Sequence, residues 1–449
     1  MTDTLSDLHF RSATEVAELV RCGRLPAREL TESTFARLDA INPELNAVVQ
    51  TDRAAAATAR GPLYGVPMTI KESFQVAGMR STWGNPAFAD YVAPADAVVV
   101  RRLRAAGAVL YGTTNVAMML ADNGQTANPV YGRTVNPWDA TRTPGGSTGG
   151  GAAAVAAGLS FLEYGSDLAG SIRIPAAFCG VYGLKPSEGT TPTGGFQPPG
   201  PPVGPSHMGY LSAVGPLARS AGDLRTALRV TGGPDGAQAN AYRWRLAPPR
   251  HNRLTDFRVG VVLDHPAAAV TGEVGGALSD AVDALGAAGA TIVEGWPAGI
   301  DPVGQAESFG FEVGQFFAFH GGDPDFAPLS RVVAQHQRRM DARGAWDRYF
   351  ADVDVFLSPT VFTAAFPHTE TQTISTADGQ RPYHELGFWI APASLCGLPA
   401  LNAPIGRTAA GLPVGAQLTG PRHEDDTAIT FAELAAERIG GFAPPPVSG

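Results

Sequence analysis

The chain has 449 residues, of which 44% are hydrophobic, so it can bury a large core in one big domain or in two to three smaller ones. Its formal net charge of -9 and its lack of any Lys/Arg block argue against a protein that binds nucleic-acid backbones. No apolar run approaches the roughly 18 residues of a membrane span, the N-terminus lacks the features of a secretory signal, and three widely spaced cysteines suit a reduced compartment. We therefore expect a soluble cytoplasmic globular protein.

The N-terminal part of the chain predicts alternating helices and strands. Apolar spacing predicts two amphipathic helices over residues 13–40, separated by a break at Gly23–Pro26. The next expected elements are, in chain order, a strand over 65–71, a helix over 96–107 that stops at a glycine, a strand over 108–115, a small-residue helix over 152–159 and a strand over 161–167.

The rest of the chain continues this alternation after one long interruption. Residues 187–216 are dense in Gly and Pro and predict a long loop, because periodic segments resume on both sides. The later expected elements are a strand over 258–264, a helix and a strand over 273–294, a strand over 350–360 and a helix over 426–440. The alternation as a whole predicts an α/β fold with a largely parallel or mixed buried sheet.

A glycine-rich stretch, TPGGSTGGGAAAVAAG at 143–158, is the first candidate for chemistry. It lacks the lysine that would end a phosphate-binding loop, and its glycines lack the spacing of a dinucleotide fingerprint. The segment Gly145–Gly149 matches G-x-S-x-G, the nucleophile elbow of α/β hydrolases, with Ser147 at its centre. A structural loop that enters a small-residue helix would show the same residues and is the commoner case, so the stretch alone leaves both interpretations open.

The combination of motifs is more specific than any one of them. Taken in order, GVPMTIKES (65–73), TPGGSTGGGAAA (143–154) and GSDLAGSIRIPA (165–176) resemble the amidase signature family. The segments NPVYGRTVNPWDATRTPGG, AAFCGVYGLKPSEG, GLPALNAPIG and GLPVGAQLTGP also resemble it, so the resemblance spans nearly the whole chain. In the family the second signature serine follows the first by 24 positions, as Ser171 follows Ser147.

The resemblance implies a single amidase domain over residues 1–449, with a mixed β-sheet core flanked by helices. Within it we expect N-terminal helices in 1–60, a signature core in 61–230, a peripheral α/β portion in 255–375 and a C-terminal part, 381–449, that returns to the core.

The resemblance also implies a Ser–cis-Ser–Lys catalytic triad. Matched residue by residue, Lys71 is the base, Ser147 is the bridging serine, joined to Gly146 by a cis peptide, and Ser171 is the nucleophile. A serine hydroxyl near neutral pH needs a base within hydrogen-bond reach, and no histidine occurs in these motifs. Lys71 ends an apolar strand and could serve as that base only if burial keeps it neutral.

Backbone N–H groups of Leu168, Ala169, Gly170 and Ser171 are implied as donors to the oxyanion. The sequence departs from the family here, because Leu168 carries no hydroxyl and Ala169 stands where glycine is usual. Alanine is strained where the backbone requires a positive φ, so we expect a negative φ at Ala169. Thr148 replaces the second serine of the usual Gly-Gly-Ser-Ser.

Other residues of interest are expected to be structural. Asp167 and Arg173 should hold the nucleophile loop through hydrogen bonds, and Cys179 should be a small buried residue. No His/Cys/Asp spacing resembles a metal site, and the histidines considered lie in predicted loops: His207, His368 and His384.

Two residues are predicted to contact the substrate. Met119 is one, because the family often lines its acyl pocket from the segment 118–120, which otherwise predicts core residues. Phe196 is the other, because the Gly/Pro loop suggests a roomy, apolar pocket mouth whose large side chains are Phe196, His207, Met208 and Tyr210.

The combined prediction is an amidohydrolase that cleaves acyl C–N bonds through a seryl acyl-enzyme, with small-molecule amides, aryl amides, carbamates or esters as candidate substrates. No metal, organic cofactor, nucleic acid or membrane partner is expected, and the protein is expected to be a monomer or homodimer. Three alternatives stay open. One is the amidase-like subunit of a glutamine-dependent tRNA amidotransferase, which usually has glutamine where this chain has Ile174. The others are a conventional α/β hydrolase that uses Ser147 and a non-catalytic binding protein on an amidase scaffold.

Overall fold

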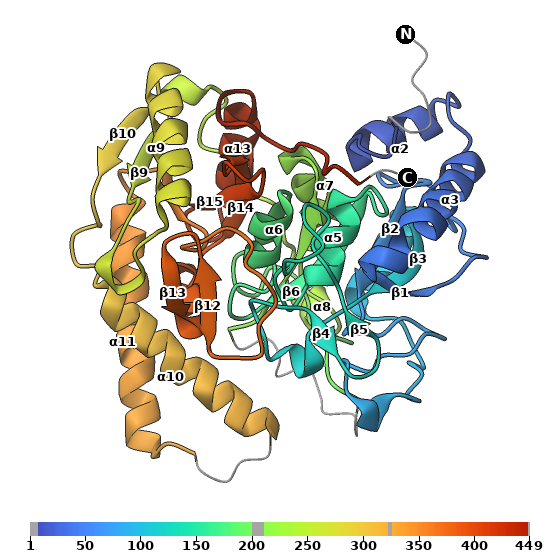
Figure 1. Cartoon of the computed structure of the whole chain (residues 1–449), viewed down its shortest axis with the longest axis horizontal. Coiled ribbons are helices and arrows are strands. Elements are labelled where there is room, and N and C mark those ends of the chain that lie inside the picture. Colours follow the sequence, from blue (N-terminus) through green and yellow to red (C-terminus); the bar gives the residue numbers. More distant parts are fainter. Residues whose placement is uncertain (1–7, 200–210, 322–325, 448–449) are drawn as a thin grey trace.

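A long twisted sheet runs through the computed structural model, which describes residues 8–199, 211–321 and 326–447 (Figure 1). Its strands are β1 (Val48–Thr51), β2 (Pro67–Lys71), β3 (Val109–Thr114), β6 (Leu162–Asp167), β7 (Tyr182–Lys185), β8 (Ala213–Ala218), β9 (Arg258–Val261), β10 (Thr291–Glu294), β11 (Val355–Pro359), β14 (Ala400–Arg407) and β15 (Pro413–Thr419). Within the described ranges the sheet has eleven strands in the order β1-β3-β2-β6-β8-β7-β14-β15-β11-β9-β10. Strands from both halves of the chain therefore meet in a single sheet.

The sheet is mixed, as the alternating pattern predicts. Neighbours are parallel in the groups β3-β2-β6 and β11-β9-β10 and antiparallel from β6 through β8, β7, β14 and β15 to β11. The chain thus forms a single-domain α/β fold with a large mixed sheet, and the predicted fold class is confirmed. The finer division into 1–60, 61–230, 255–375 and 381–449 stays a prediction.

Helices cover both faces of this sheet (Figure 1). Along β6, Tyr164 reaches Thr231 on one side, whereas Gly165 faces Thr148 on the other. Successive strand residues point to opposite faces of a sheet. The helix Gly149–Ala156, which follows Thr148, and the helix Ala221–Thr231 therefore lie on opposite faces. The helices are α2 (Ala13–Arg21), α3 (Ala27–Leu45), α4 (Val98–Ala105), α5 (Gly149–Ala156), α6 (Arg173–Cys179), α7 (Ala221–Thr231), α8 (Gln238–Ala241), α9 (Gly272–Ala287), α10 (Pro302–Gly321), α11 (Leu329–Tyr349), α12 (Ala391–Cys396) and α13 (Asp425–Ile439).

Helices α5 and α6 pack against each other on one face, and α4, α7, α13 and α9 form a row of contacts on the other. Helices α10 and α11 lie side by side and contact α12. The remaining short elements are β4 (Ala127–Asn128), β5 (Gly132–Arg133), β12 (Thr373–Thr376), β13 (Gly379–Pro382) and the 3-10 helices η1 (Pro86–Phe88), η2 (Met118–Leu120), η4 (Leu254–Asp256), η5 (Pro266–Ala268) and η6 (Tyr383–Gly387).

Local sequence explains where the first helices begin and end. Ser12 caps α2, since its hydroxyl accepts the Glu15 N–H while the Glu15 carboxylate accepts the Ser12 N–H. The chain turns at Gly23, where φ is +73°, and Pro26 precedes α3. The predicted break between two helices is confirmed.

Helix α5 is the element that brings the glycine-rich stretch onto the sheet. All eight of its residues are glycine, alanine or valine, and all are buried. The helix begins at Gly149, earlier than the 152–159 predicted from apolar residues, because its glycines continue the helix where the pattern gave no periodic signal. The small side chains let α5 lie close to the strands beneath it.

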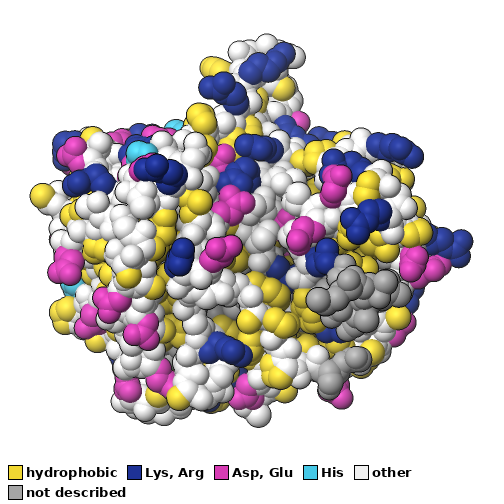
Figure 2. All heavy atoms as spheres, turned by 90° about the horizontal axis from the view of Figure 1, so that it is seen from above, with side chains coloured by type: hydrophobic (Ala, Val, Ile, Leu, Met, Phe, Trp, Pro, Cys, Tyr) yellow, Lys and Arg dark blue, Asp and Glu magenta, His cyan; other side chains and the backbone are white. Residues whose placement is uncertain are grey.

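The predicted loop over 187–216 is shorter than expected. Its last residues belong to β8, which begins at Ala213 and pairs with β6 and β7. His207, Met208 and Tyr210 lie outside the described residues. In the parts of the chain that are described, no helix has the length and apolar character needed to cross a membrane. The face shown in Figure 2 carries acidic, basic and apolar side chains intermixed.

Candidate active site

Lys71 is the last residue of β2, held between β3 and β6, and its side chain is fully buried. Its Nζ donates hydrogen bonds to Ser147 Oγ at 2.8 Å and to Ser166 Oγ at 2.9 Å. Burial lowers the pKa of Lys71 to about 7, although the negative charges of Asp167 and Glu163 oppose the shift. The amine is therefore neutral in a large fraction of molecules near neutral pH.

Ser147 lies in the tight turn that leads into α5. The peptide bond between Gly146 and Ser147 is cis, as the resemblance implies. The Gly146 N–H donates to the Asn123 carbonyl at 3.0 Å. A Cβ on Gly146 would lie 2.1 Å from the Gln125 carbonyl oxygen and 2.6 Å from the Asp122 carbonyl oxygen. Only glycine fits between these carbonyls, and this packing fixes the turn that presents Ser147 to Lys71.

Ser171 lies in the turn between β6 and α6 and is 5% exposed. Its carbonyl accepts the Thr148 N–H at 3.2 Å, which joins the Ser171 turn to the Ser147 turn. Among the described residues, the hydroxyls of Ser147 and Ser171 make no hydrogen bond with each other. The structure thus brings Lys71 and Ser147 into direct contact and places Ser171 on the adjoining turn.

Asp167 and Arg173 hold the Ser171 turn from inside. Arg173 donates from Nε to Asp167 Oδ2 at 3.0 Å and from Nη2 to Oδ1 at 2.9 Å, and neither side chain is exposed. Burial opposes ionisation of Asp167, but Arg173 outweighs it and lowers the pKa of Asp167 to about 2. Arg173 also donates to Gln417 at 2.7 Å and to Ser394 at 2.7 Å. Their predicted structural role is confirmed.

The oxyanion donors need one correction. The Gly170 N–H already donates to Asp167 Oδ1 at 2.9 Å, so it does not point freely toward a substrate. The N–H groups of Leu168, Ala169 and Ser171 donate no hydrogen bond within the described part of the chain and stay the predicted donors. Their suitability as an oxyanion hole remains a prediction.

The positive φ of this turn falls on Gly170, at +88°, and not on Ala169. A Cβ at Gly170 would lie 2.8 Å from Ile174 Cδ1, so that position requires glycine on both counts. The expected negative φ at Ala169 is confirmed, since Ala169 is absent from the positive-φ residues of the described chain. The Ala169 carbonyl accepts from Asn123 Nδ2 at 3.0 Å, which orients the peptide that precedes Gly170.

The sequence motifs missed three residues of this site. Ser166 gives Lys71 its second hydroxyl partner, Asn123 ties together both serine turns, and Glu163 is a buried acid near the lysine. A signal was available for two of them, because Glu163 and Ser166 are polar residues on a strand that is predicted to be buried, FLEYGSD.

The segment 118–120 only partly matches the prediction of core residues. Met118 is 47% exposed, so its assignment to the core is wrong, while Met119 and Leu120 are half-buried against the core. Met119 and Leu120 have left-handed φ values of 51° and 59°, and this sharp turn leaves Met118 at the surface. Contact of Met119 with a substrate stays a prediction.

Phe196 is buried and packs against two aromatic side chains. Its ring centroid lies 5.0 Å from that of Phe74 and 5.3 Å from that of Trp83. In this arrangement it supports Trp83 from within the core, and a direct contact with substrate remains a prediction. Cys179 is buried as predicted, and burial raises the pKa of its thiol.

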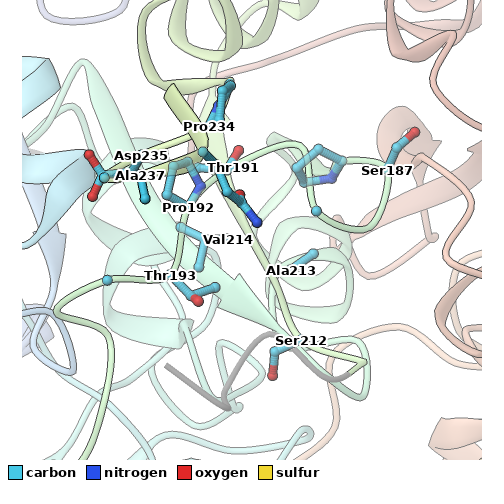
Figure 3. Close-up of a pocket in the computed structure, with 16 residues that line it drawn as sticks. Ser187, Thr191, Pro192, Thr193, Ser212, Ala213, Val214, Pro234, Asp235 and Ala237 are labelled. Atoms are coloured by element: carbon cyan, nitrogen blue, oxygen red, sulfur yellow. The ribbon is translucent and has the colours of Figure 1, made fainter. Parts of the chain in front are cut away.

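A cavity of about 550 Å³ lies beside the start of β8 (Figure 3). Ala213 in its wall pairs with Asp167 across the sheet, so the cavity adjoins the strand that leads to the Ser171 turn. Neither Ser147 nor Ser171 lines it. Its walls come from three segments, 186–194, 212–214 and 233–238.

Comparison with known proteins agrees with this fold. A family model described as Amidase matches residues 29–308 and 300–429. An acylamidase of Rhodococcus erythropolis is 34% identical, covering 97% of this chain and 97% of that protein. One component of the glutamyl-tRNA(Gln) amidotransferase of Synechococcus is 30% identical, covering 95% of this chain and 96% of that one. A solved structure of 6-aminohexanoate cyclic dimer hydrolase with its substrate is 28% identical, with a TM-score of 0.82 over 98% of this chain and 99% of that chain.

The fold and the site together define a class of protein: an α/β protein with a mixed sheet, in which a buried lysine is hydrogen-bonded to a serine in a glycine-rich turn. The chain belongs to the amidase family. The resemblance seen in its motifs is thereby confirmed, and the nucleophile-elbow interpretation of Gly145–Gly149 is set aside.

Proposed function

We propose that this chain is an amidohydrolase that cleaves acyl C–N bonds of non-peptide amides through an acyl-enzyme on Ser171. The observation that carries the proposal is the hydrogen bond of 2.8 Å from Lys71 Nζ to Ser147 Oγ, in a site where burial lowers the pKa of the lysine to about 7. A neutral amine bonded to a hydroxyl is the arrangement that a serine nucleophile needs in the absence of histidine.

The proposed reaction moves one proton along the three side chains. As Ser171 Oγ bonds to the substrate carbonyl carbon, its proton passes to Ser147 Oγ, and the Ser147 proton passes to Lys71 Nζ. The carbonyl oxygen becomes an oxyanion near the N–H groups of Leu168, Ala169 and Ser171.

Collapse of this intermediate breaks the C–N bond and returns the proton through Ser147 to the leaving nitrogen. Water then attacks the ester on Ser171 by the same relay and releases a carboxylic acid. The relay itself needs no group beyond the three side chains.

Amides with an apolar acyl or aryl part are the substrate class that we favour, with carbamates and esters as further candidates. Support comes from the acylamidase relative and from the apolar side chain of Leu168, which lies in the Ser171 turn and packs against the core. A cytoplasmic location and a monomeric or homodimeric state complete the proposal. The proposed location rests on the three widely spaced cysteines of the sequence.

The test combines labelling with turnover. The purified protein is treated with an aryl fluorophosphonate and examined by intact mass, and hydrolysis of matched amide, ester and carbamate chromogens is measured in parallel. We expect one adduct per chain, located at Ser171, and turnover of at least one amide. The Ser375→Ala variant, which changes an exposed serine of β12, serves as the matched control and should behave as the wild type.

Failure to label or to turn over any substrate would favour a non-catalytic binding protein. The second candidate function, a component of an amidotransferase, is favoured by the amidotransferase relative at 30% identity. Against it, Ile174 is buried in an apolar cluster and offers no amide group. Co-purification with a second protein chain, together with glutamine hydrolysis, would move the conclusion to that candidate.

A further inference from the structure

A second buried titratable group, Glu163, lies on the same face of the sheet as Lys71. Glu163, in β6, is fully buried and points toward α5. A Cβ on Gly151 of that helix would lie 2.5 Å from Glu163 Cγ, so the absence of a side chain at Gly151 provides the space that the glutamate occupies. The acid is therefore built into the packing between helix and sheet.

Two hydroxyls hold the Glu163 carboxyl in place. Thr114 Oγ1 of β3 donates to Glu163 Oε1 at 2.7 Å, and Thr69 Oγ1 of β2 donates to Oε2. Thr69 precedes Lys71 by two residues, so both side chains leave β2 on the same face. The carboxyl thus lies beside Thr69, on the face of the sheet that carries the Lys71 side chain and α5.

The charges around Lys71 single out Glu163. The other acid that acts on the lysine, Asp167, is already paired with Arg173 through two hydrogen bonds. Among the described residues Glu163 has no such partner: its contacts are hydroxyls, and the basic group that acts on it is Lys71.

In the described part of the chain, the elements packed around Glu163 bring no further charged group into contact with its carboxyl. Helix α5 consists of glycine, alanine and valine, and the phenol of Tyr111 on β3 donates to the Leu159 carbonyl. Glu72, next to Lys71 in sequence, accepts from the N–H groups of Thr82 and Trp83 instead. Glu163 is thus the buried acid whose charge interacts mainly with that of Lys71.

We propose that Glu163 is a positioning residue of this centre, and that the charge on its carboxyl decides when the Lys71 amine is free to accept a proton from Ser147. An ionised carboxylate in a dry interior favours the ammonium form, whereas a protonated carboxyl leaves the amine neutral. Burial raises the pKa of Glu163 to about 8, close to that of the lysine, so the two groups titrate as a pair. The inference rests on the proposed role of Lys71 as the base.

The test follows the protonation of Lys71 directly. The ε-carbon NMR signal of isotope-labelled lysine is titrated in the wild type and in Glu163→Gln, and Lys71 is assigned from the signal that Lys71→Met removes. Removing the negative charge should move the titration of Lys71 to lower pH by about half a unit to one unit. The acid limb of kcat/KM should move by the same amount in the same direction.

Glu72→Gln is the matched control, because it removes a buried carboxyl from the neighbouring residue and should leave the Lys71 titration in place. If Glu163→Gln does not fold, Thr114→Val provides a second variant. It removes one hydrogen-bond donor to Glu163, which disfavours the carboxylate and should move the Lys71 titration to lower pH by a smaller amount. Thr114→Ser keeps a hydroxyl and should restore the wild-type titration.

An unchanged titration in folded Glu163→Gln, or a shift to higher pH, would overturn the inference. The proposed function fails separately, through absence of labelling and turnover in the wild type, while the NMR titration still reports on the Glu163–Lys71 pair.

Discussion

Two lysines of this chain are buried in the sheet, and their surroundings differ. Lys71 ends β2 and donates to two serine hydroxyls, whereas Lys185 ends β7 and donates to the Pro186 carbonyl at 3.1 Å. Burial lowers the pKa of both, to about 7 for Lys71 and about 8 for Lys185. Arg173 also lowers the pKa of Lys185, while the carboxylates of Asp167, Glu188 and Asp425 raise it.

The comparison separates two requirements for a lysine base. Burial makes the amine neutral at accessible pH, and both lysines meet this requirement. The second requirement is a neighbouring hydroxyl that can pass on a proton. Of the two lysines, Lys71 meets it, because the glycine-rich turn brings Ser147 to the end of β2. A carbonyl partner accepts a hydrogen bond but has no proton to transfer.

The largest expected effect comes from Ser171, the proposed nucleophile at the end of the serine pair that adjoins Lys71 and has no counterpart at Lys185. Ser171→Ala removes the atom that would carry the acyl group, so turnover and fluorophosphonate labelling should both disappear while the fold persists. Circular dichroism and thermal unfolding check the fold. A variant that keeps more than a few per cent of wild-type turnover would show that another residue is the nucleophile.

Exchanging each lysine for methionine breaks the comparison most directly. Lys71→Met should lower kcat/KM by about a thousandfold or more, because no other base contacts Ser147 in the described part of the chain. Lys185→Met should change kcat/KM by less than about tenfold, because its amine contacts neither serine. Equal losses in the two variants would mean that burial and charge, and not the hydroxyl contact, decide the activity.

The pH dependence sharpens the assignment. Lys71 must be neutral to accept a proton, and below its pKa of about 7 the ammonium form dominates. Wild-type kcat/KM should therefore fall about tenfold per pH unit below pH 7 and level off above it. Residual activity of Lys71→Met should lack this limb. The same limb in both proteins would indicate a different titrating base.

The smallest effects concern the turn that presents Ser171. Gly170→Ala should lower kcat/KM by about tenfold to a hundredfold, because an alanine at φ +88° is strained and its Cβ meets Ile174. Ala169→Gly should change it by less than about tenfold, since the positive φ lies elsewhere. A gain of a hundredfold in Ala169→Gly would show that alanine hinders the turn.

The sequence motifs predict the three central side chains because each lies in a local pattern of several residues. Lys71, Ser147 and Ser171 stand at fixed places in such patterns, and the structure puts them on one strand end and two adjoining turns. Their catalytic roles stay predictions until the variants are made.

The partners that complete the site could not be predicted in the same way. The contact of Lys71 with Ser166, and the neighbouring position of Glu163, depend on the register between β2 and β6, which lie far apart in the chain. Periodicity assigns each residue to a strand but does not give the register. The hydrogen bond from Gly170 to Asp167 likewise depends on the geometry of one turn.

The place of β14 and β15 in the sheet has a consequence for synthesis. Residues 400–419 fill the gap between β7 and β11, so the strands made earlier on the β7 side form a sheet with one edge left open until these residues are made. That edge is β7, directly after the helix that follows Ser171. While the chain is still on the ribosome, this exposed edge can pair with other chains. Pairing of β14 with β7, and not early folding of the N-terminal strands, therefore covers this edge.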